Sequence, residues 1–344
     1  MSKHVLIVGG GIAGLASAWE LARNGLQVSL LERRQAGQES SWAGAGILSA
    51  LLPWDYRRPV NRLIQASLAQ YPAWIDALRQ VASTDPEYRQ TGMLVLPPFD
   101  AQAADRWLND RALGLDSLPA EIAERLPGAT AGLWLGHVAQ VRNPRILSAL
   151  RQACEASGVK ISEMSQVNGL KTAGDRVSGV VTDAGLWQAD DYLLTTGAWS
   201  AQLLGSLSPN LPVRPMRGQM LLYQTAPGTL PCIVYREGGY LVPRADVAAE
   251  GARPVGGAAV YQDSSAGWMW QAGTGKPLAV LRGHVFDAAE AGDWDGSAVA
   301  AESRLTLLVK ALLHAASLAL YLLPLAGTLP VPVTSRRQVD SPPP

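Results

Sequence analysis

Cysteine and histidine are scarce in this sequence of 344 residues, and its formal net charge is zero. The only two cysteines, Cys154 and Cys232, argue against a disulfide framework and fit a reducing compartment, so we expect a cytoplasmic protein. The four histidines have no ligand-like spacing, and we expect no metal site. Basic and acidic residues number 29 each. The sequence therefore has no excess of positive charge that would favour nucleic acid or an anionic membrane surface as the main partner.

Apolar residues are abundant by contrast, at 48% of the chain, and the length suggests two domains. The composition changes along the chain, because residues 1–244 contain nine Ile and six Asn whereas the last 100 residues contain neither. This change marks a boundary near residue 244. Residues 311–329 lack Asp, Glu, Lys and Arg and approach membrane-spanning length, although a buried helix followed by a loop is the favoured interpretation.

A dinucleotide-binding motif opens the chain. Residues 5–8 are all apolar, as a strand buried on both faces requires, and they lead into the glycine-rich segment GGGIAG at 9–14. Helical spacing of apolar residues follows until Gly25, and a second apolar run at 28–31 ends at Glu32. This order of strand, glycine turn, helix, strand and acid predicts a βαβ dinucleotide site.

Each part of the motif has a physical role. Gly9 permits the tight turn, Gly11 lets the backbone approach a pyrophosphate, and Gly14 allows the helix to pack closely on the strand. The N-terminus of the helix offers N–H groups and a positive dipole end to the phosphates. Glu32 can accept both ribose hydroxyls and its charge disfavours a 2′-phosphate, so the motif favours FAD or NAD over NADP.

Further motifs resemble a known family. They are SSWAGAGIL at 40–48, followed by Pro53-Trp54, then QVRNPR at 140–145, GAWS at 197–200, RPMRGQ at 214–219 and YLVPR at 240–244. Together with the glycine motif they resemble the D-amino-acid oxidase superfamily of FAD-dependent oxidoreductases, and most closely its bacterial glycine oxidase branch of thiamine biosynthesis. The resemblance covers residues 3–244, and the last 100 residues depart from the family pattern.

The resemblance implies an α/β protein with two discontinuous domains. A doubly wound, Rossmann-like FAD-binding domain would comprise residues 1–80 and 140–205. An α+β substrate domain with a mainly antiparallel sheet would comprise residues 81–139 and 206–260, and residues 261–344 would form a divergent tail.

The expected cofactor contacts follow from residue type and from the resemblance. The small residues at 43–46 allow the backbone to pass close to a flat ring system, and the two serines before them can donate to phosphate or ribitol oxygens. Tyr240 matches a family tyrosine whose hydroxyl faces the substrate carboxylate, and the alternative is a tyrosine packed within a strand. Matched to the family, the cofactor-binding residues are Gly9, Gly11, Ile12, Ala13, Gly14, Glu32, Arg33, Ser40, Ser41, Ala45, Gly46, Ile47, Val167 and Gly197.

Other segments carry structural expectations. Asn143 followed by proline predicts a helix N-cap, with the helix closed by Gly158. Residues 176–182 and 188–196 are expected to pair like a hairpin, and Trp199 is expected to pack rather than to take part in chemistry. Two arginines, at 214 and 217, either clamp a carboxylate or support a strand, and the second interpretation is favoured.

The implied reaction is the FAD-dependent oxidation of glycine or another small amino acid to the imine and 2-oxo acid. The flavin takes a hydride from the substrate Cα, and dioxygen then reoxidises the flavin to give hydrogen peroxide. Because the free amine can lose hydride directly, no general base is needed and no catalytic side chain is assigned. The partners are therefore a small amino acid and dioxygen, and a homo-oligomer is left open.

The tail leaves two other interpretations open. The family arginine that clamps the substrate carboxylate should follow residue 244, yet no matching segment is found, and LRG at 281–283 does not give Arg282 this role. A reading-frame shift near Asp246 would explain the departure and leave a disordered tail. The chain would then be an inactive or truncated flavoprotein. Alternatively, residues 311–329 would anchor a membrane-associated amino-acid dehydrogenase.

Overall fold

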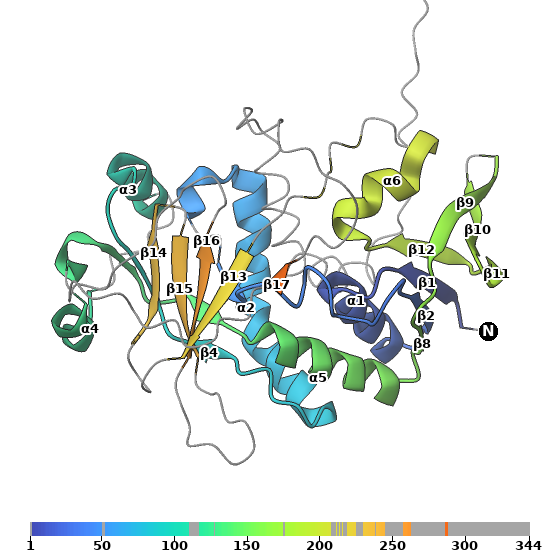
Figure 1. The fold of residues 1–344 in the computed structure, drawn as a ribbon, viewed down its shortest axis with the longest axis horizontal. Helices are drawn as coiled ribbons and strands as arrows, with labels where there is room; N and C mark the ends of the chain where they lie inside the picture. Colours follow the sequence, from blue (N-terminus) through green and yellow to red (C-terminus); the bar gives the residue numbers. More distant parts are fainter. Residues whose placement is uncertain are drawn as a thin grey trace, which may run out of the picture.

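Two β-sheets with a long helix between them organise the chain (Figure 1). The computed structural model describes residues 2–49, 52–109, 117–126, 128–174, 176–207, 211, 213, 215, 219–224, 230–237, 239–244, 257–262 and 286–287. Arg214, Arg217, Arg282 and residues 311–329, for which the sequence raised expectations, lie outside this set.

The first sheet is parallel and has the strand order β12-β1-β2-β8. Its strands are β1 (His4–Val8), β2 (Gln27–Leu31), β8 (Lys160–Ser162) and β12 (Asp191–Leu194). Helix α1 (Ile12–Arg23) connects β1 to β2 and is followed by Gly25 with φ of +85°. The predicted βαβ unit and α/β class are thereby confirmed.

Both faces of β1 are buried, which explains its unbroken apolar sequence. Val5 and Ile7 pack into a core with α1, α2 (Arg58–Val81) and α5 (Asn143–Ala156). Leu6 and Val8 point to the opposite face and pack against a three-stranded antiparallel sheet. That sheet consists of β9 (Val167–Ala173), β10 (Arg176–Thr182) and β11 (Gly185–Trp187), beside which lies α6 (Ser200–Leu204) (Figure 1).

The expected pairing of residues 176–182 with 188–196 is wrong. Strand β10 pairs with β9 and β11 instead, and Thr182 faces Gly185 across a two-residue turn. Strand β12 lies in the parallel sheet, where Asp191–Leu194 pair with β1. The sequence of a short strand does not reveal which sheet it joins, because several partners satisfy the same alternation of side chains.

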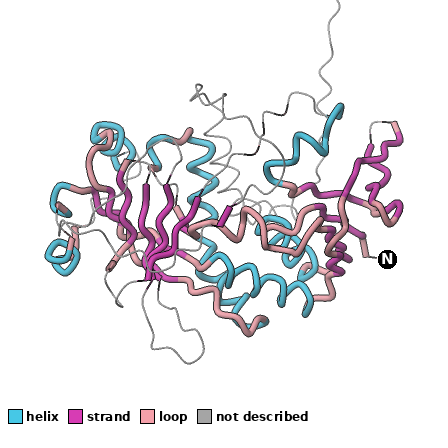
Figure 2. The backbone as a smooth tube through the Cα atoms, viewed as in Figure 1, coloured by secondary structure: helices cyan, strands magenta, loops and turns pink. Residues whose placement is uncertain are grey.

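The second sheet has the order β17-β13-β16-β15-β14-β5-β6. Its pairs are antiparallel except for β14 with β5, in agreement with the predicted mainly antiparallel sheet. Helices α3 (Ala101–Asn109) and α4 (Ala120–Arg125) lie at its outer end (Figure 2). Its strands are β5 (Met93–Val95), β6 (Leu133–Leu135), β13 (Gln219–Gln224), β14 (Ile233–Arg236), β15 (Gly239–Arg244), β16 (Gly257–Gln262) and β17 (Phe286–Asp287).

A small third sheet has the order β3-β7-β4. Its strands are β3 (Ile47–Leu48), β7 (Ala139–Gln140) and β4 (Arg89–Gln90), and Gln140 is paired with both Ile47 and Arg89. It joins the loop of small residues to chain segments near the second sheet. Four short 3-10 turns complete the described elements, at Pro53–Asp55, Ala129–Ala131, Gly197–Trp199 and Gly205–Leu207.

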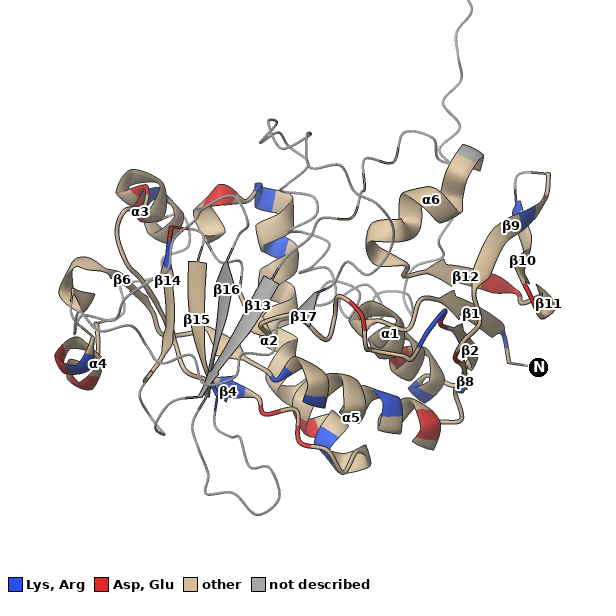
Figure 3. Cartoon of the chain, viewed as in Figure 1, with Lys and Arg blue, Asp and Glu red and all other residues tan. Residues whose placement is uncertain are grey.

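Charged residues of both signs are interspersed over the described elements, as the balanced composition predicts (Figure 3). In the part of the chain that the structure describes, no helix is both long enough and apolar enough to cross a membrane. The longest, α2, alternates buried and exposed residues along its length, as a helix that covers a core does.

Candidate functional site

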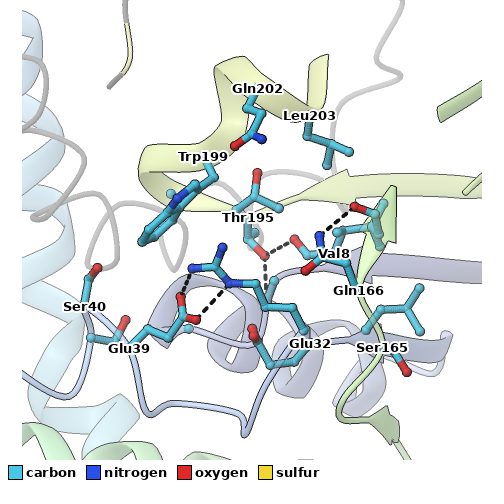
Figure 4. Close-up of a pocket in the computed structure, with 18 of the residues that line it drawn as sticks. Val8, Glu32, Glu39, Ser40, Ser165, Gln166, Thr195, Trp199, Gln202 and Leu203 are labelled. Carbon is cyan, nitrogen blue, oxygen red and sulfur yellow. Dashed lines mark hydrogen bonds and ion pairs between the residues drawn. The ribbon is translucent and has the colours of Figure 1, made fainter. Parts of the chain in front are cut away.

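A cavity of about 640 Å³ lies at the carboxyl ends of β1, β2 and β12 (Figure 4). Crevices at this edge of a parallel sheet are where α/β proteins bind nucleotides. The lining residues come from the three strand ends and from the segments that follow them: Val8, Gly9, Gly11, Leu31, Glu32, Arg33, Gln35, Gly37, Glu39, Ser40, Ser41, Ser165, Gln166, Val167, Asn168, Thr195, Thr196, Gly197, Trp199, Gln202 and Leu203.

The glycine turn leaves no room for side chains at two positions. Gly9 has φ of +107°, and an added Cβ would lie 2.6 Å from Thr195 O. A Cβ on Gly14 would lie 1.8 Å from Gly9 O, so the first turn of α1 packs directly on the glycine turn. The hydroxyl of Thr195 lies within hydrogen-bonding distance of the carbonyl oxygens of Val8 (3.0 Å) and Gly9 (2.8 Å). The turn is therefore held between α1 and the end of β12.

The N-terminus of α1 faces the loop that contains Ser40 and Ser41, here called the serine loop. Gly11 is the N-cap and provides no side-chain cap, which leaves the helix N-terminus open to an outside acceptor. The backbone N–H of Ile12 donates to Ser41 Oγ at 3.0 Å. Ser40 and Ser41 both line the cavity beside the glycines. Backbone N–H groups and hydroxyls meeting at a helix N-terminus suit a phosphate group.

Glu32 lies at the end of β2 with only 8% of its surface exposed. Its Oε2 accepts a hydrogen bond from Gly10 N at 2.6 Å, and its Oε1 accepts one from Arg34 N at 3.0 Å. The carboxylate thus fixes the glycine turn to the segment that follows β2. Since each carboxylate oxygen has a second lone pair, both remain able to accept a ribose hydroxyl.

Arg33 is held at the cavity wall by two partners, Glu39 and Trp199, both of which Figure 4 labels. Its Nε and Nη2 donate to the two carboxylate oxygens of Glu39 at 2.8 and 2.6 Å. Its guanidinium carbon lies 4.1 Å from the ring centroid of Trp199, a cation–π distance. Trp199 therefore packs, as expected, but it packs on a cavity residue. The interactions tie the segment after β2 to the turn after β12.

The loop of small residues packs against β7 rather than lining the cavity. Gly46 has φ of +68°, and an added Cβ would lie 2.1 Å from Val141 O. Val141 N donates to Gly46 O at 2.9 Å, and the next residue, Ile47, is paired with Gln140. The close approach that these small residues permit is therefore, in this structure, an approach to neighbouring backbone.

Asn143 does not cap α5, contrary to expectation. The N-cap is Arg142, and no side chain caps the helix. Asn143 is the first helical residue, and its Nδ2 donates to Ser41 O at 2.7 Å. Its Oδ1 is buried without a hydrogen-bond partner among the described residues. Asn143 thus holds the serine loop, a partner 102 positions away that no local pattern could reveal.

Tyr240 lies in β15, partly buried, and packs against the core of the second sheet. The same core contains Ala45 from the loop of small residues. The fold therefore brings the expected substrate tyrosine to the side of the loop expected to contact the cofactor. Tyr240 is not among the residues that line the cavity.

The expected cofactor residues divide into two groups. Gly9, Gly11, Glu32, Arg33, Ser40, Ser41, Val167 and Gly197 line the cavity. Outside its lining lie the first turn of α1, the loop before β3 and the first residue of β3, which hold Ile12, Ala13, Gly14, Ala45, Gly46 and Ile47.

Several lining residues were not anticipated. Glu39 lies directly before the two serines, Ser165, Gln166 and Asn168 follow β8, and residues 195–196 follow β12. The general rule that parallel strands bind ligands at their carboxyl ends could have identified the two strand-end segments. Applying this rule to the segment after β12 requires knowing that β12 lies beside β1.

The two cysteines take no part in the cavity. Cys154 lies buried in α5 with Sγ 3.2 Å from Leu15 O, and burial raises the pKa of its thiol to about 12. Burial likewise raises the pKa of Cys232 to about 12. Both are protonated at neutral pH and are poor nucleophiles. Within the described ranges, no three His, Cys, Asp or Glu side chains group as a metal site.

The arrangement fits an adenine dinucleotide. The absence of a side chain at Gly9 and Gly14 lets α1 pack directly on the glycine turn, and the N-terminus of α1 lies beside the serine hydroxyls. An almost buried carboxylate, Glu32, stands at the end of the adjacent strand. A pyrophosphate and a ribose need these groups at these places.

Comparison with known proteins agrees with this geometry. A family model described as "FAD dependent oxidoreductase" matches residues 4–308, which extends past the end of the motif resemblance at residue 244. Glycine oxidase of Pseudomonas aeruginosa is 40% identical over 252 residues, which cover 72% of this chain and 69% of that protein. Glycine oxidase of Pseudomonas putida is 38% identical with the same coverage.

Solved structures have the same fold. Glycine oxidase from Geobacillus kaustophilus matches with a TM-score of 0.61 and 28% identity, covering 70% of this chain and 69% of that one. L-proline dehydrogenase from P. horikoshii, at 18% identity, matches in fold with a TM-score of 0.65 over 96% of both chains. The chain belongs to the family of FAD-dependent oxidoreductases, and its cofactor is FAD.

Proposed function

We propose that this protein oxidises glycine or another small amino acid with FAD and dioxygen to the imine and hydrogen peroxide, and that water then hydrolyses the imine to the 2-oxo acid and ammonia. The observation that carries the proposal is the glycine turn of a dinucleotide-binding motif, with Gly14 packed on Gly9, in a chain 40% identical to a glycine oxidase. A bifunctional protein ThiO/ThiG of Synechocystis is 34% identical over 71% of this chain and 37% of its own length. This similarity supports a role in thiamine biosynthesis, where the product would feed thiazole formation.

The described residues support this chemistry by binding and positioning. When bound, FAD supplies the acceptor for the hydride removed from the substrate Cα. The turn at Gly9 and Gly11 and the hydroxyls of Ser40 and Ser41 would hold the pyrophosphate, and Glu32 would hold the adenosine ribose. Val167 and Gly197 would enclose the cofactor from the β8 and β12 sides.

Tyr240 would position the substrate from the second sheet. Its phenol can donate a hydrogen bond to a carboxylate, and its strand packs in the same core as Ala45 of the loop.

We further propose that residues 1–80 and 140–205 form the FAD-binding domain and residues 81–139 and 206–260 the substrate domain. The parallel sheet falls in the first set, and most of the antiparallel sheet falls in the second.

Peroxide formation tests the function. The purified full chain, saturated with FAD, is expected to produce hydrogen peroxide and glyoxylate in equal amounts from glycine in air. A flavin that glycine and other small amino acids fail to reduce under anaerobic conditions would contradict the proposal and indicate a flavoprotein without this activity. Reduction of a quinone in place of dioxygen would instead indicate a dehydrogenase.

Glu32→Gln tests the cofactor site separately. We expect it to weaken FAD binding at least about tenfold, since hydrogen bonds to a charged group contribute about 1.5–3 kcal/mol. The new amide would place an N–H donor against Gly10 N or Arg34 N, both of which are donors themselves. FAD titration of the apoprotein by fluorescence measures the change. Glu155→Gln, at an exposed position of α5, serves as the control, and equal affinities for the two variants would contradict the assignment.

A further inference from the structure

Arg244 joins the second sheet to the loop of small residues at 43–46, which is expected to face the flavin. Its Nη1 donates to Gln140 Oε1 and to Val141 O, both at 3.0 Å, and its Nη2 donates to Ala45 O. The chain separation between Arg244 and Ala45 is 199 residues, so this contact connects parts of the molecule that are far apart in sequence. The motif that contains Arg244 indicates the family resemblance and by itself implies no role for this side chain.

The acceptors of Arg244 are deeply buried. Ala45, Gln140 and Val141 are 5%, 2% and 3% exposed. Gln140 in turn donates from Nε2 to Thr91 Oγ1 at 3.0 Å, so the amide that accepts from Arg244 is itself held in place. A planar guanidinium that reaches three acceptors in fixed directions restricts all of them at once, which a lysine ammonium on its flexible stem does not reproduce.

Arg244 shares a strand face with Tyr240. Side chains at positions i, i+2 and i+4 of a strand point to the same side, and in β15 these are Tyr240, Val242 and Arg244. Val242 is fully buried and Tyr240 packs in the same core, which also contains Ala45. One end of this strand face therefore carries the expected substrate tyrosine, and the other end is hydrogen-bonded to the loop.

We propose that Arg244 is a positioning residue that fixes the distance between Tyr240 and the loop at 43–47. Its guanidinium ties the loop backbone at Ala45 to the strand that carries the substrate-binding side chain. FAD and the amino acid would then be aligned by a single rigid unit. The proposal rests on FAD binding and on the proposed role of Tyr240, but its main measurements need no substrate.

Arg244→Met removes the three hydrogen bonds and keeps a side chain of similar length. We expect FAD affinity to fall about tenfold, the effect of losing roughly one charged hydrogen bond that orders the loop. The visible absorption bands of the bound flavin should shift as well, because the polarity around the ring changes when the loop is released. With glycine as substrate, KM should rise more than kcat falls, and Arg244→Lys should give intermediate values for each quantity.

The matched control is Arg236→Met on the neighbouring strand β14. Arg236 is 46% exposed and pairs only loosely, at 3.3 Å, with the exposed Glu237, so its loss should leave affinity and spectrum unchanged. Gln140→Met removes one acceptor and is expected to shift both flavin readouts in the same direction by a smaller amount. In the double variant the two effects should be less than additive, since Gln140 acts through Arg244.

The proposal would be overturned if Arg244→Met lowered the melting temperature but had the same flavin affinity and spectrum as Arg236→Met. Arg244 would then be a purely structural residue. If Arg244→Met does not fold, Arg244→Lys and Gln140→Met decide the matter, and wild-type flavin readouts in both would reject it. Because these readouts are made without an amino acid, failure of the oxidase activity is separately visible.

Discussion

Replacing Gly14 with alanine is expected to reduce FAD affinity about 100-fold, the largest loss that we anticipate for a single methyl group. The added Cβ would lie 1.8 Å from Gly9 O and 2.9 Å from the Thr195 hydroxyl oxygen. Since backbone cannot yield as a flexible side chain does, α1 must move away from the glycine turn. Overpacking of this kind costs about 1–3 kcal/mol, and about 1.4 kcal/mol corresponds to a factor of ten in binding.

The apoprotein can relax this collision by displacing the turn, but a bound pyrophosphate requires the turn in its original place. The strain therefore falls on binding as well as on folding, and the melting temperature should drop by several degrees. Gly169→Ala is the matched control, because Gly169 has nothing within 4 Å of an added Cβ. FAD titration and thermal unfolding of both variants measure the effect. Equal FAD affinity in the two would show that close packing at Gly14 is not needed.

Gly46→Ala is the second variant with a large expected effect. Its φ of +68° lies in the left-handed region, where an L-residue loses roughly 1–2 kcal/mol, and the new Cβ would also lie 2.1 Å from Val141 O and 2.5 Å from Asn143 Oδ1. Relief requires the loop to separate from β7, which would break the bond between Val141 N and Gly46 O. We expect an FAD affinity reduced by about 10- to 100-fold, and an altered flavin absorption spectrum.

Gly174→Ala separates the two causes. Gly174 has a similar φ of +63° but nothing within 4 Å of an added Cβ, so this variant suffers the backbone strain without the collision. It should lose some stability and keep the flavin spectrum. If Gly46→Ala behaves in the same way, the loop does not need its contact with β7 to hold the cofactor.

The sequence predicted those parts of the site whose signals are local. The βαβ unit depends on apolar runs, a glycine turn and an acid within 32 residues, and each of these imposes its structure on its own neighbourhood. The structure has Gly9 in a positive-φ turn, Gly14 against that turn and Glu32 at the end of β2, where the pattern places them. The α/β class and the FAD-dependent family follow from the same residues and from the further motifs.

Contacts between distant segments were decided only by the tertiary structure. The sequence does not indicate that Asn143 holds Ser41, that Arg33 stacks on Trp199, or that Arg244 reaches Ala45. Nor does it assign β12 to the parallel sheet, since a strand of only four residues can pair with many partners equally well. Local patterns determine elements and turns because neighbouring residues share one backbone geometry. Which side chains meet across the site depends on how all the elements pack, and that is a property of the whole fold.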